Sequence, residues 1–189
     1  PKTLYLNDGT GHFTRVPGPL SSAMSGNSTY LGAHDLNGDG LPDLVGDWES
    51  AAGFTRQWWI NEGGGTFSDG QVLELPPGAS EAINASLALG DLDGDGDLDI
   101  YGLNWLAGFS FNDCTLRGNG DGTFSNLTTL SNSSSDDNEG DFLDYDQDGD
   151  LDLFVANFSG SDKLYRNNNN GGSSFSFTSV SGGDPGPSY

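Results

Sequence analysis

The apolar residues of this chain fall in short runs that alternate with polar, glycine-rich segments. Leu44 and Val45, residues 100–103 and residues 153–155 are examples, and they show little of the three- and four-residue periodicity of a helix. Short runs of this kind, bounded by Gly, Asn, Asp and Ser, are typical of β-strands and turns. The pattern therefore predicts an all-β fold built from many short strands.

The pattern also repeats along the chain. The motif D-x-[DN]-x-D-G-x-x-D begins at Asp35, Asp91 and Asp144, which lie 56 and 53 residues apart. A glycine-rich turn ending in phenylalanine keeps nearly the same interval, at residues 7–13, 61–67, 118–124 and, in a looser form, 167–175. Self-similarity at a fixed interval of this size is typical of repeat architectures, which include propellers.

Each repeat is expected to hold four strands, with the acidic motif between the first two and the glycine-rich turn between the last two. The predicted segments are a half blade at 1–17, blades at about 28–75, 82–130 and 138–180, and a Gly- and Pro-rich linker or tail at 181–189. Residues 76–78 and 131–137 are expected to connect the blades. Within them, strands are expected from Ile100 to Trp105 and from Gly140 to Leu143.

The acidic motif places oxygen ligands at alternate positions of a nine-residue loop. Ca²⁺ takes about six to eight oxygens at about 2.3–2.6 Å, so side chains at positions 1, 3, 5 and 9 with the carbonyl of position 7 suit it better than Mg²⁺. Glycine at position 6 permits the sharp turn. The alternative is an Asp-Gly turn without a metal. Three copies in register favour calcium, because empty loops would hold like charges close together.

The first half of the motif matches an EF-hand, which ends with Glu at position 12 and lies between helices. Position 12 is here Gly46, Gly102 and Val155. The loops are therefore predicted to join strand to strand, with Asp43, Asp99 and Asp152 as closing ligands.

Charge and composition exclude several classes of partner. The net charge is −22, with 28 acidic and six basic residues, and the three loops hold 13 of the acidic ones. A chain with so few basic residues has no patch for nucleic acid, and an anionic membrane would repel it. No run of about eighteen apolar residues predicts a membrane span. No signal peptide is visible, and the chain begins within an expected strand, as a processed or excised piece would.

Cysteine and asparagine bear on localisation. Cys114 is alone, which excludes an internal disulfide and leaves either a buried apolar role or pairing with another chain. Together with calcium chemistry, five glycosylation sequons favour a secreted glycoprotein. They lie at Asn27, Asn84, Asn126, Asn132 and Asn157.

A family resemblance follows from these motifs. The stretches DLNGDGLPDLV, DLDGDGDLDIYG and DYDQDGDLDLFVAN are each followed by WWINEGGGTF, LRGNGDGTF or LYRNNNNGG. They resemble the FG-GAP/VCBS repeats of integrin α-subunit propellers and related secreted proteins. The resemblance covers nearly the whole chain and implies four-stranded propeller blades with a calcium loop between the first two strands.

The resemblance also implies three calcium sites. The implied ligands are Asp35, Asn37, Asp39, the Leu41 carbonyl and Asp43 in the first; Asp91, Asp93, Asp95, the Asp97 carbonyl and Asp99 in the second; and Asp144, Asp146, Asp148, the Asp150 carbonyl and Asp152 in the third. The first loop is predicted to bind calcium least tightly, because Asn37 stands where the others have Asp. Propellers close with about four to eight blades, so three and a half blades imply a fragment or completion by a neighbouring copy.

Catalysis is not predicted, because the acidic pairs belong to the loops and the two histidines, His12 and His34, form no triad or zinc spacing. The favoured function is an extracellular, calcium-stabilised structural or adhesion module, whose partners are other copies of itself or neighbouring blades. The alternative is a lectin-like propeller that stacks sugars or contacts an extracellular protein through Trp58 or Trp59. Adjacent strand residues face opposite ways, so one of these two is expected to be exposed.

Overall fold

The computed structural model describes residues 3–16, 31–50, 53–68, 70–72, 87–102, 105–106, 110–111, 113–133, 136–159, 161–169 and 175–180. All regular structure in these ranges is β-strand in antiparallel sheets, which confirms the predicted fold class. Within them, no helix has the length and apolar character that a membrane crossing needs. The chain divides into two compact units, Pro1–Glu74 and Leu75–Tyr189.

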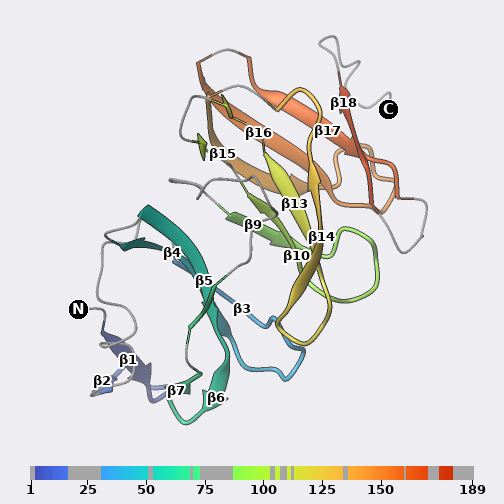
Figure 1. Cartoon of the computed structure of the whole chain (residues 1–189). Coiled ribbons are helices and arrows are strands. Elements are labelled where there is room, and N and C mark those ends of the chain that lie inside the picture. The colour runs from blue at the N-terminus through green and yellow to red at the C-terminus, as the bar shows by residue number, and fades with distance from the viewer. Residues whose placement is uncertain are drawn as a thin grey trace. The chain divides into compact units, whose positions relative to one another are not determined.

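The second unit contains two four-stranded sheets (Figure 1). Blade 2 consists of β9 (Leu87–Gly90), β10 (Asp99–Gly102), β13 (Cys114–Gly118) and β14 (Phe124–Thr129). Blade 3 consists of β15 (Asp136–Leu143), β16 (Asp152–Ser159), β17 (Lys163–Asn167) and β18 (Phe177–Val180). Each sheet is a meander in which every strand pairs with the strand that follows it in the sheet. A short ribbon of β11 (Trp105–Leu106) and β12 (Ser110–Phe111) lies in the sequence between β10 and β13.

The core of this unit draws on both blades. Ala88, Tyr101 and Leu130 of the blade 2 repeat cluster with Leu153, Val155 and Tyr165 of blade 3. The Tyr101 ring meets Phe142 edge to face, with centroids 6.4 Å apart. Because β10 is buried along its whole length, both of its faces carry apolar residues, which explains the uninterrupted Ile-Tyr-Gly run after the acidic loop.

Close approach of the two blades depends on Gly140 of β15. A methyl group there would overlap Cε1 of Tyr101, a buried residue of β10. On the other side, a methyl group on Gly90 of β9 would lie 2.9 Å from Leu151 Cδ1 and 3.0 Å from Phe142 Cδ2. Glycine at these places lets strand backbone rest directly on aromatic and leucine side chains.

The first unit contains blade 1, a sheet of β3 (Leu31–His34), β4 (Asp43–Ser50), β5 (Gly53–Trp59) and β8 (Gln71–Val72). Two ribbons accompany it: β1 (Leu4–Asn7) with β2 (Phe13–Val16), and β6 (Asn61–Gly63) with β7 (Thr66–Phe67). Trp59 is the buried centre of its core, and Leu4, Leu44 and Phe67 pack against it. The ribbon of β1 and β2 lies in the segment that was predicted to be a half blade.

Several predicted boundaries require correction. Strand β15 begins at Asp136, inside the segment predicted to connect blades 2 and 3, because residues 136–139 continue the ladder with β16 through two irregularities. Strand β10 ends at Gly102 rather than Trp105, which instead pairs with Phe111 in the ribbon. In blade 1 the glycine-rich turn forms its own ribbon, β6 with β7, and the fourth strand of the described sheet is β8. The tail at 181–189 and the connection at 76–78 lie outside the described residues.

Candidate metal centres

The three acidic motifs form loops between the first and second strands of their blades, as predicted. Loop 1 (residues 35–43) joins β3 to β4, loop 2 (91–99) joins β9 to β10, and loop 3 (144–152) joins β15 to β16. The glycine at position 6 has a positive φ in each, +83° at Gly40, +94° at Gly96 and +96° at Gly149. Its amide donates to the position 1 carboxylate, at 2.8 Å in loop 1, 3.0 Å in loop 2 and 3.2 Å in loop 3. The sharp turn therefore aims backbone amides at the first aspartate.

The aspartate at position 9 is the most buried group of each loop. Asp43, Asp99 and Asp152 all have 0% exposure. One oxygen of each accepts the amide of position 2: from Leu36 at 2.8 Å, Leu92 at 2.7 Å and Tyr145 at 3.0 Å.

The other oxygen of each closing aspartate accepts an amide at the end of the third strand or just beyond it. The donors are Asn61 at 2.7 Å, Gly118 at 2.8 Å and Asn167 at 2.8 Å. One side chain thus ties the loop to the second and third strands of its blade, and its charge is satisfied by two amides.

Three carboxylates converge in loop 2 and three in loop 3. Ligand oxygens of Asp91, Asp93 and Asp99 lie within 4.8 Å of one another, and the same holds for Asp144, Asp146 and Asp152. These are positions 1, 3 and 9, three of the four side chains implied by the family resemblance. An all-oxygen donor set with several carboxylates matches a hard cation such as Ca²⁺, so the residues present fit the ion.

The position 5 carboxylates make a contact that the sequence did not predict. In loop 2, Arg117 of β13 places Nη2 2.6 Å from Asp95 Oδ2 and Nε 2.6 Å from Asp93 Oδ2. In loop 3, Arg166 of β17 places Nη2 2.8 Å from Asp148 Oδ2 and Nε 2.7 Å from Asp146 Oδ2. Both arginines immediately precede the residue whose amide binds the closing aspartate. That shared place in the repeat was the available sequence signal.

Loop 1 is built differently at two points. The position 3 residue is Asn37, whose Nδ2 donates to Asp39 Oδ2 at 3.1 Å. The residue that corresponds to the two arginines is Ile60, just before Asn61. Loop 1 therefore has fewer carboxylates and an apolar residue where loops 2 and 3 have a guanidinium.

Burial and the arginines move the pKa values of the loop carboxyls in opposite directions. Burial raises the pKa of Asp99 to about 6, because its charged form loses water. Burial likewise raises the pKa of Asp93 and of Asp152. The Asp97 amide and the Arg117 guanidinium hold the pKa of Asp95 below its usual range, and Arg166 does so for Asp148.

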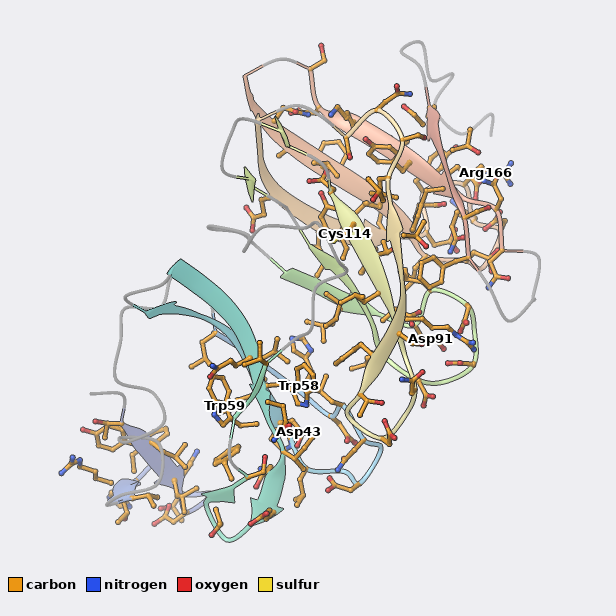
Figure 2. All side chains as sticks on the ribbon, viewed as in Figure 1. Asp43, Trp58, Trp59, Asp91, Cys114 and Arg166 are labelled. Atoms are coloured by element: carbon orange, nitrogen blue, oxygen red, sulfur yellow. The ribbon has the colours of Figure 1, made fainter. Side chains whose placement is uncertain are left out.

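The remaining candidate residues have varied surroundings. Both tryptophans come from β5 (Figure 2); Trp59 is buried, at 1% exposure, and Trp58 is half-buried. Trp59 is therefore a core residue, and neither of the two has the full exposure that was expected of one of them. Cys114 is buried, with Sγ 3.9 Å from the Gly102 carbonyl oxygen.

The sequons also differ in surroundings. Asn132 is exposed in the turn after β14, with a φ of 61°. Asn157 is half-buried in β16, and its Nδ2 donates to the Ser161 carbonyl at 2.7 Å. Asn27, Asn84 and the side chain of Asn126 lie outside the described residues.

Four-stranded antiparallel meanders, each with an acidic loop between its first two strands, define a β-propeller-type repeat protein. A family model described as FG-GAP-like repeat matches residues 2–46, 53–102 and 144–189, more than half of the chain. The chain belongs to this family. Each matched segment contains one acidic loop and one glycine-rich turn. A search of the curated proteins found no match.

Proposed function

We propose that this chain is an extracellular structural or adhesion module whose blades are stabilised by three calcium ions. The observation that carries the proposal is the convergence of three carboxylates at the same place in blades 2 and 3. Repeats of this family suggest an integrin-like adhesion module, commonly bind calcium and are typically extracellular. The proposed ligand set retains the side chains at positions 1, 3, 5 and 9 and the position 7 carbonyl of all three loops. None of these carboxylates is assigned to catalysis.

In this proposal the closing aspartates transmit ion binding to the blade. Each of them already binds an amide of its own loop and an amide at the third strand. Bound calcium supplies two positive charges among carboxylates that otherwise repel one another. The carboxylate oxygens that face the loop then also hold the second and third strands in register. Loss of the ion is expected to weaken the contacts between the acidic loop and the second and third strands of each blade.

Thermal unfolding of the full chain with calcium and with EGTA tests this role. Saturating calcium is expected to raise Tm by roughly 5–10 °C, which corresponds to a few kcal/mol of linked binding. Magnesium at the same concentration is expected to raise it far less, because of its stricter geometry. Asp91→Asn and Asp144→Asn should each remove part of the calcium-dependent rise. Equal Tm values in calcium and EGTA would contradict the proposal.

We also propose that other copies of this chain are partners, through the half blade of β1 and β2. Tyr5 and Phe13 of this ribbon are 54% and 63% exposed, and a two-stranded ribbon alone is marginally stable in water. Strands supplied by a second copy would complete the sheet and cover these side chains. A molar mass well above 19.8 kDa by light scattering supports this arrangement, and a monomer at all concentrations contradicts it.

Carbohydrate binding is the second candidate. Of the two adjacent tryptophans, Trp58 retains exposure at its position in β5, opposite Gln71 of β8. An indole in a sheet can stack on a sugar ring through its face. If this function holds, Trp58→Ala abolishes binding on a glycan array while Tm stays nearly constant. An array without any bound glycan would exclude it.

A further inference from the structure

Two arginines meet loops 2 and 3 in the same way. Arg117 and Arg166 come from the third strands of their blades, and each bridges the carboxylates at positions 3 and 5 with two nitrogens at 2.6–2.8 Å. Arg117 is 27% exposed and Arg166 is 47% exposed, so both stems reach their loops from the solvent side. Figure 2 shows Arg166 beside the loops at the end of blade 3. One guanidinium thus places a positive charge against two carboxylates of each loop, with a charge-assisted hydrogen bond to position 5.

We infer that Arg117 and Arg166 are built-in counter-ions, which neutralise loops 2 and 3 when calcium is absent and are displaced when calcium binds. This inference rests on the proposed function. It assigns a role to two residues outside the ligand set and makes calcium binding at these loops an exchange of one cation for another.

The position 5 carboxylate shows why exchange is required. Asp95 Oδ1 accepts the Asp97 amide at 2.9 Å, and its Oδ2 is held by Arg117. Asp148 is held in the same way, with Oδ1 accepting the Asp150 amide at 3.1 Å and Oδ2 paired with Arg166. Positions 1, 3 and 9 already converge, and position 5 is the remaining side chain of the proposed ligand set. Because each guanidinium contacts position 5 and also position 3, it has to release both carboxylates before all four side chains can bind one ion.

Electrostatics favours this exchange over sharing. A divalent ion among these carboxylates would lie within a few ångströms of the guanidinium, and two cations at such a distance repel each other. Each arginine is partly exposed and has a long flexible stem, so it can turn into solvent at little cost in packing. Without the ion, the same guanidinium lowers the repulsion among the five aspartates of its loop.

Loop 1 is a natural comparison within the same chain. Ile60 occupies the corresponding place and carries no charge. The inference therefore predicts that loop 1 loses its folded form first in a chelator, while loops 2 and 3 retain theirs. It also predicts that an arginine introduced at position 60 hinders calcium at loop 1 alone.

Nuclear magnetic resonance resolves the three loops separately in the full chain. The amides of Gly40, Gly96 and Gly149 all bind the position 1 aspartate of their own loops, so each reports calcium at one site. The variants are Arg117→Gln, Arg166→Gln and Ile60→Arg, titrated in chelator-buffered calcium. Arg15→Gln is the matched control, because it removes an exposed arginine of β2 with the same change of charge.

The glutamine variants and Ile60→Arg are expected to shift the calcium midpoints in opposite directions. Arg117→Gln should lower the calcium midpoint of the Gly96 amide roughly three- to tenfold and should lower Tm in EGTA. Arg166→Gln should do the same for Gly149. Ile60→Arg should raise the midpoint of Gly40, and Arg15→Gln should move none of them. Arg117→Lys keeps the charge without the planar fork, so its midpoint should lie between those of wild type and Arg117→Gln.

A calcium midpoint that stays constant or rises in both glutamine variants would overturn the inference, because the arginines would then act as supports of the calcium-bound loop. Amide dispersion of the β-sheet residues shows whether each variant is folded. If none of the three glycine amides responds to calcium in the wild-type chain, the proposed function itself fails. The two failures are therefore distinguishable.

Discussion

At the scale of single residues, each closing aspartate joins its loop to two strands of its blade. Each is completely buried, and each accepts two backbone amides, one from its own loop and one at or just beyond the end of the third strand. A buried carboxylate is favourable only when it is hydrogen-bonded in this way. The same residue serves as a proposed ligand and as a structural clamp, which explains its place between a loop and two strands.

Asp99→Ala is therefore expected to be costly even without calcium. It leaves the Leu92 and Gly118 amides without their carboxylate, and each buried orphan donor costs about 1–3 kcal/mol. Urea unfolding of the calcium-free chain should show a loss of roughly 2–5 kcal/mol. Glu139→Ala, on an exposed residue of β15, should change stability by less than about 0.5 kcal/mol. Equal effects of the two variants would contradict the clamp.

Asp99 also predicts how calcium-free stability varies with pH. Burial raises its pKa to about 6 in the folded chain, above the usual value near 4 that it has when unfolded. The folded chain thus binds this proton more tightly, so the free energy of unfolding should fall as pH rises from about 4 to about 6. Asp93 and Asp152, whose pKa values are also raised by burial, act in the same direction.

Saturating calcium should reverse this dependence, since protons then compete with the ion for the same carboxylates. Urea unfolding at several pH values, with and without calcium, measures both curves. Calcium-free stability that rises between pH 4 and 6 would contradict the burial of Asp99. Asp95 and Asp148 have lowered pKa values, so their contribution disappears only as pH falls below about 4.

The function of the loop residues could be predicted from the sequence, because each ligand position must supply an oxygen to the ion. The spacing of Asp and Gly was enough to place the sharp turn at Gly96 and to identify Asp99 as the closing residue of its loop. The complete burial of Asp99 was not predicted. Arg117 and Arg166 could not be assigned in the same way, because an arginine in a strand has many possible partners. Their guanidinium groups reach the acidic loops because β13 pairs with β10 and β17 pairs with β16 in a particular register, which the sequence does not show.

At the scale of elements, Asn167 connects two loops. Its amide donates to Asp152 of loop 3, and its buried Nδ2 donates to the Leu92 carbonyl of loop 2 at 2.8 Å. The Leu92 amide in turn donates to Asp99. A continuous path of hydrogen bonds therefore joins the closing aspartates of blades 2 and 3. In blade 2 the corresponding residue is Gly118, where a methyl group would overlap the Leu98 carbonyl oxygen.

Asn167→Ala is expected to weaken this connection. It removes the Asn167 donor to the Leu92 carbonyl, which retains the 3.3 Å contact from Asn169 Nδ2, and it removes the Oδ1 acceptor of the buried Asn169 amide. The cost should be about 1–3 kcal/mol in urea unfolding. The coupling can also be measured at a single residue. In the otherwise wild-type chain, Asp144→Asn removes calcium from loop 3 and should shift the amide resonance of Gly96 in loop 2. In the Asn167→Ala chain, the same substitution should cause a smaller shift. An unchanged shift would show that the path does not carry the coupling.

Gly140 makes a second prediction at this scale. Gly140→Ala places a methyl group on the Tyr101 ring and should destabilise the second unit by about 1–3 kcal/mol through overpacking. Tyr101→Leu should itself be destabilising, but it frees space for the methyl group. A double-mutant cycle should therefore show a cost for the pair below the sum of the two single costs. Strict additivity would contradict the close packing of β15 on β10.

The element predictions succeeded where a turn signal bounded an apolar run and failed elsewhere. Strands were also expected at residues 86–90, 114–117 and 163–167, and β9, β13 and β17 agree with these ranges to within a residue, since acidic or glycine-rich turns flank them. The start of β15 was missed, because Asp136, Asp137 and Glu139 have polar side chains that resemble a loop while their backbones continue the ladder with β16. The ribbon of β11 and β12 was missed because its strands have only two residues each.

At the scale of the whole molecule, the sheets are open and the net charge is high. None of the described sheets closes on itself. The repeats in the sequence predict the number of blades. They do not predict which strand pairs with the edge strand of a sheet, because that pairing depends on the surfaces that meet there. The net charge of −22 resists association of copies at low salt, and three bound calcium ions would remove part of that barrier.

Assembly through the half blade can be tested with one substitution. Phe13→Ser removes the most exposed large apolar side chain of the β1 and β2 ribbon and should shift the light-scattering mass towards 19.8 kDa. Phe154→Ser, at an exposed phenylalanine of β16 in blade 3, is the control and should leave the mass unchanged. Assembly that is insensitive to Phe13→Ser would exclude the half blade as the contact.

Isothermal titration of calcium into the calcium-free full chain tests the central claim most directly, that the three acidic loops are calcium sites. The account predicts binding of three ions per chain, reduced to two by Asp91→Asn or by Asp144→Asn, because each removes a carboxylate from one convergent triad. Absence of binding heat in wild type, or a stoichiometry that these variants leave unchanged, would contradict it.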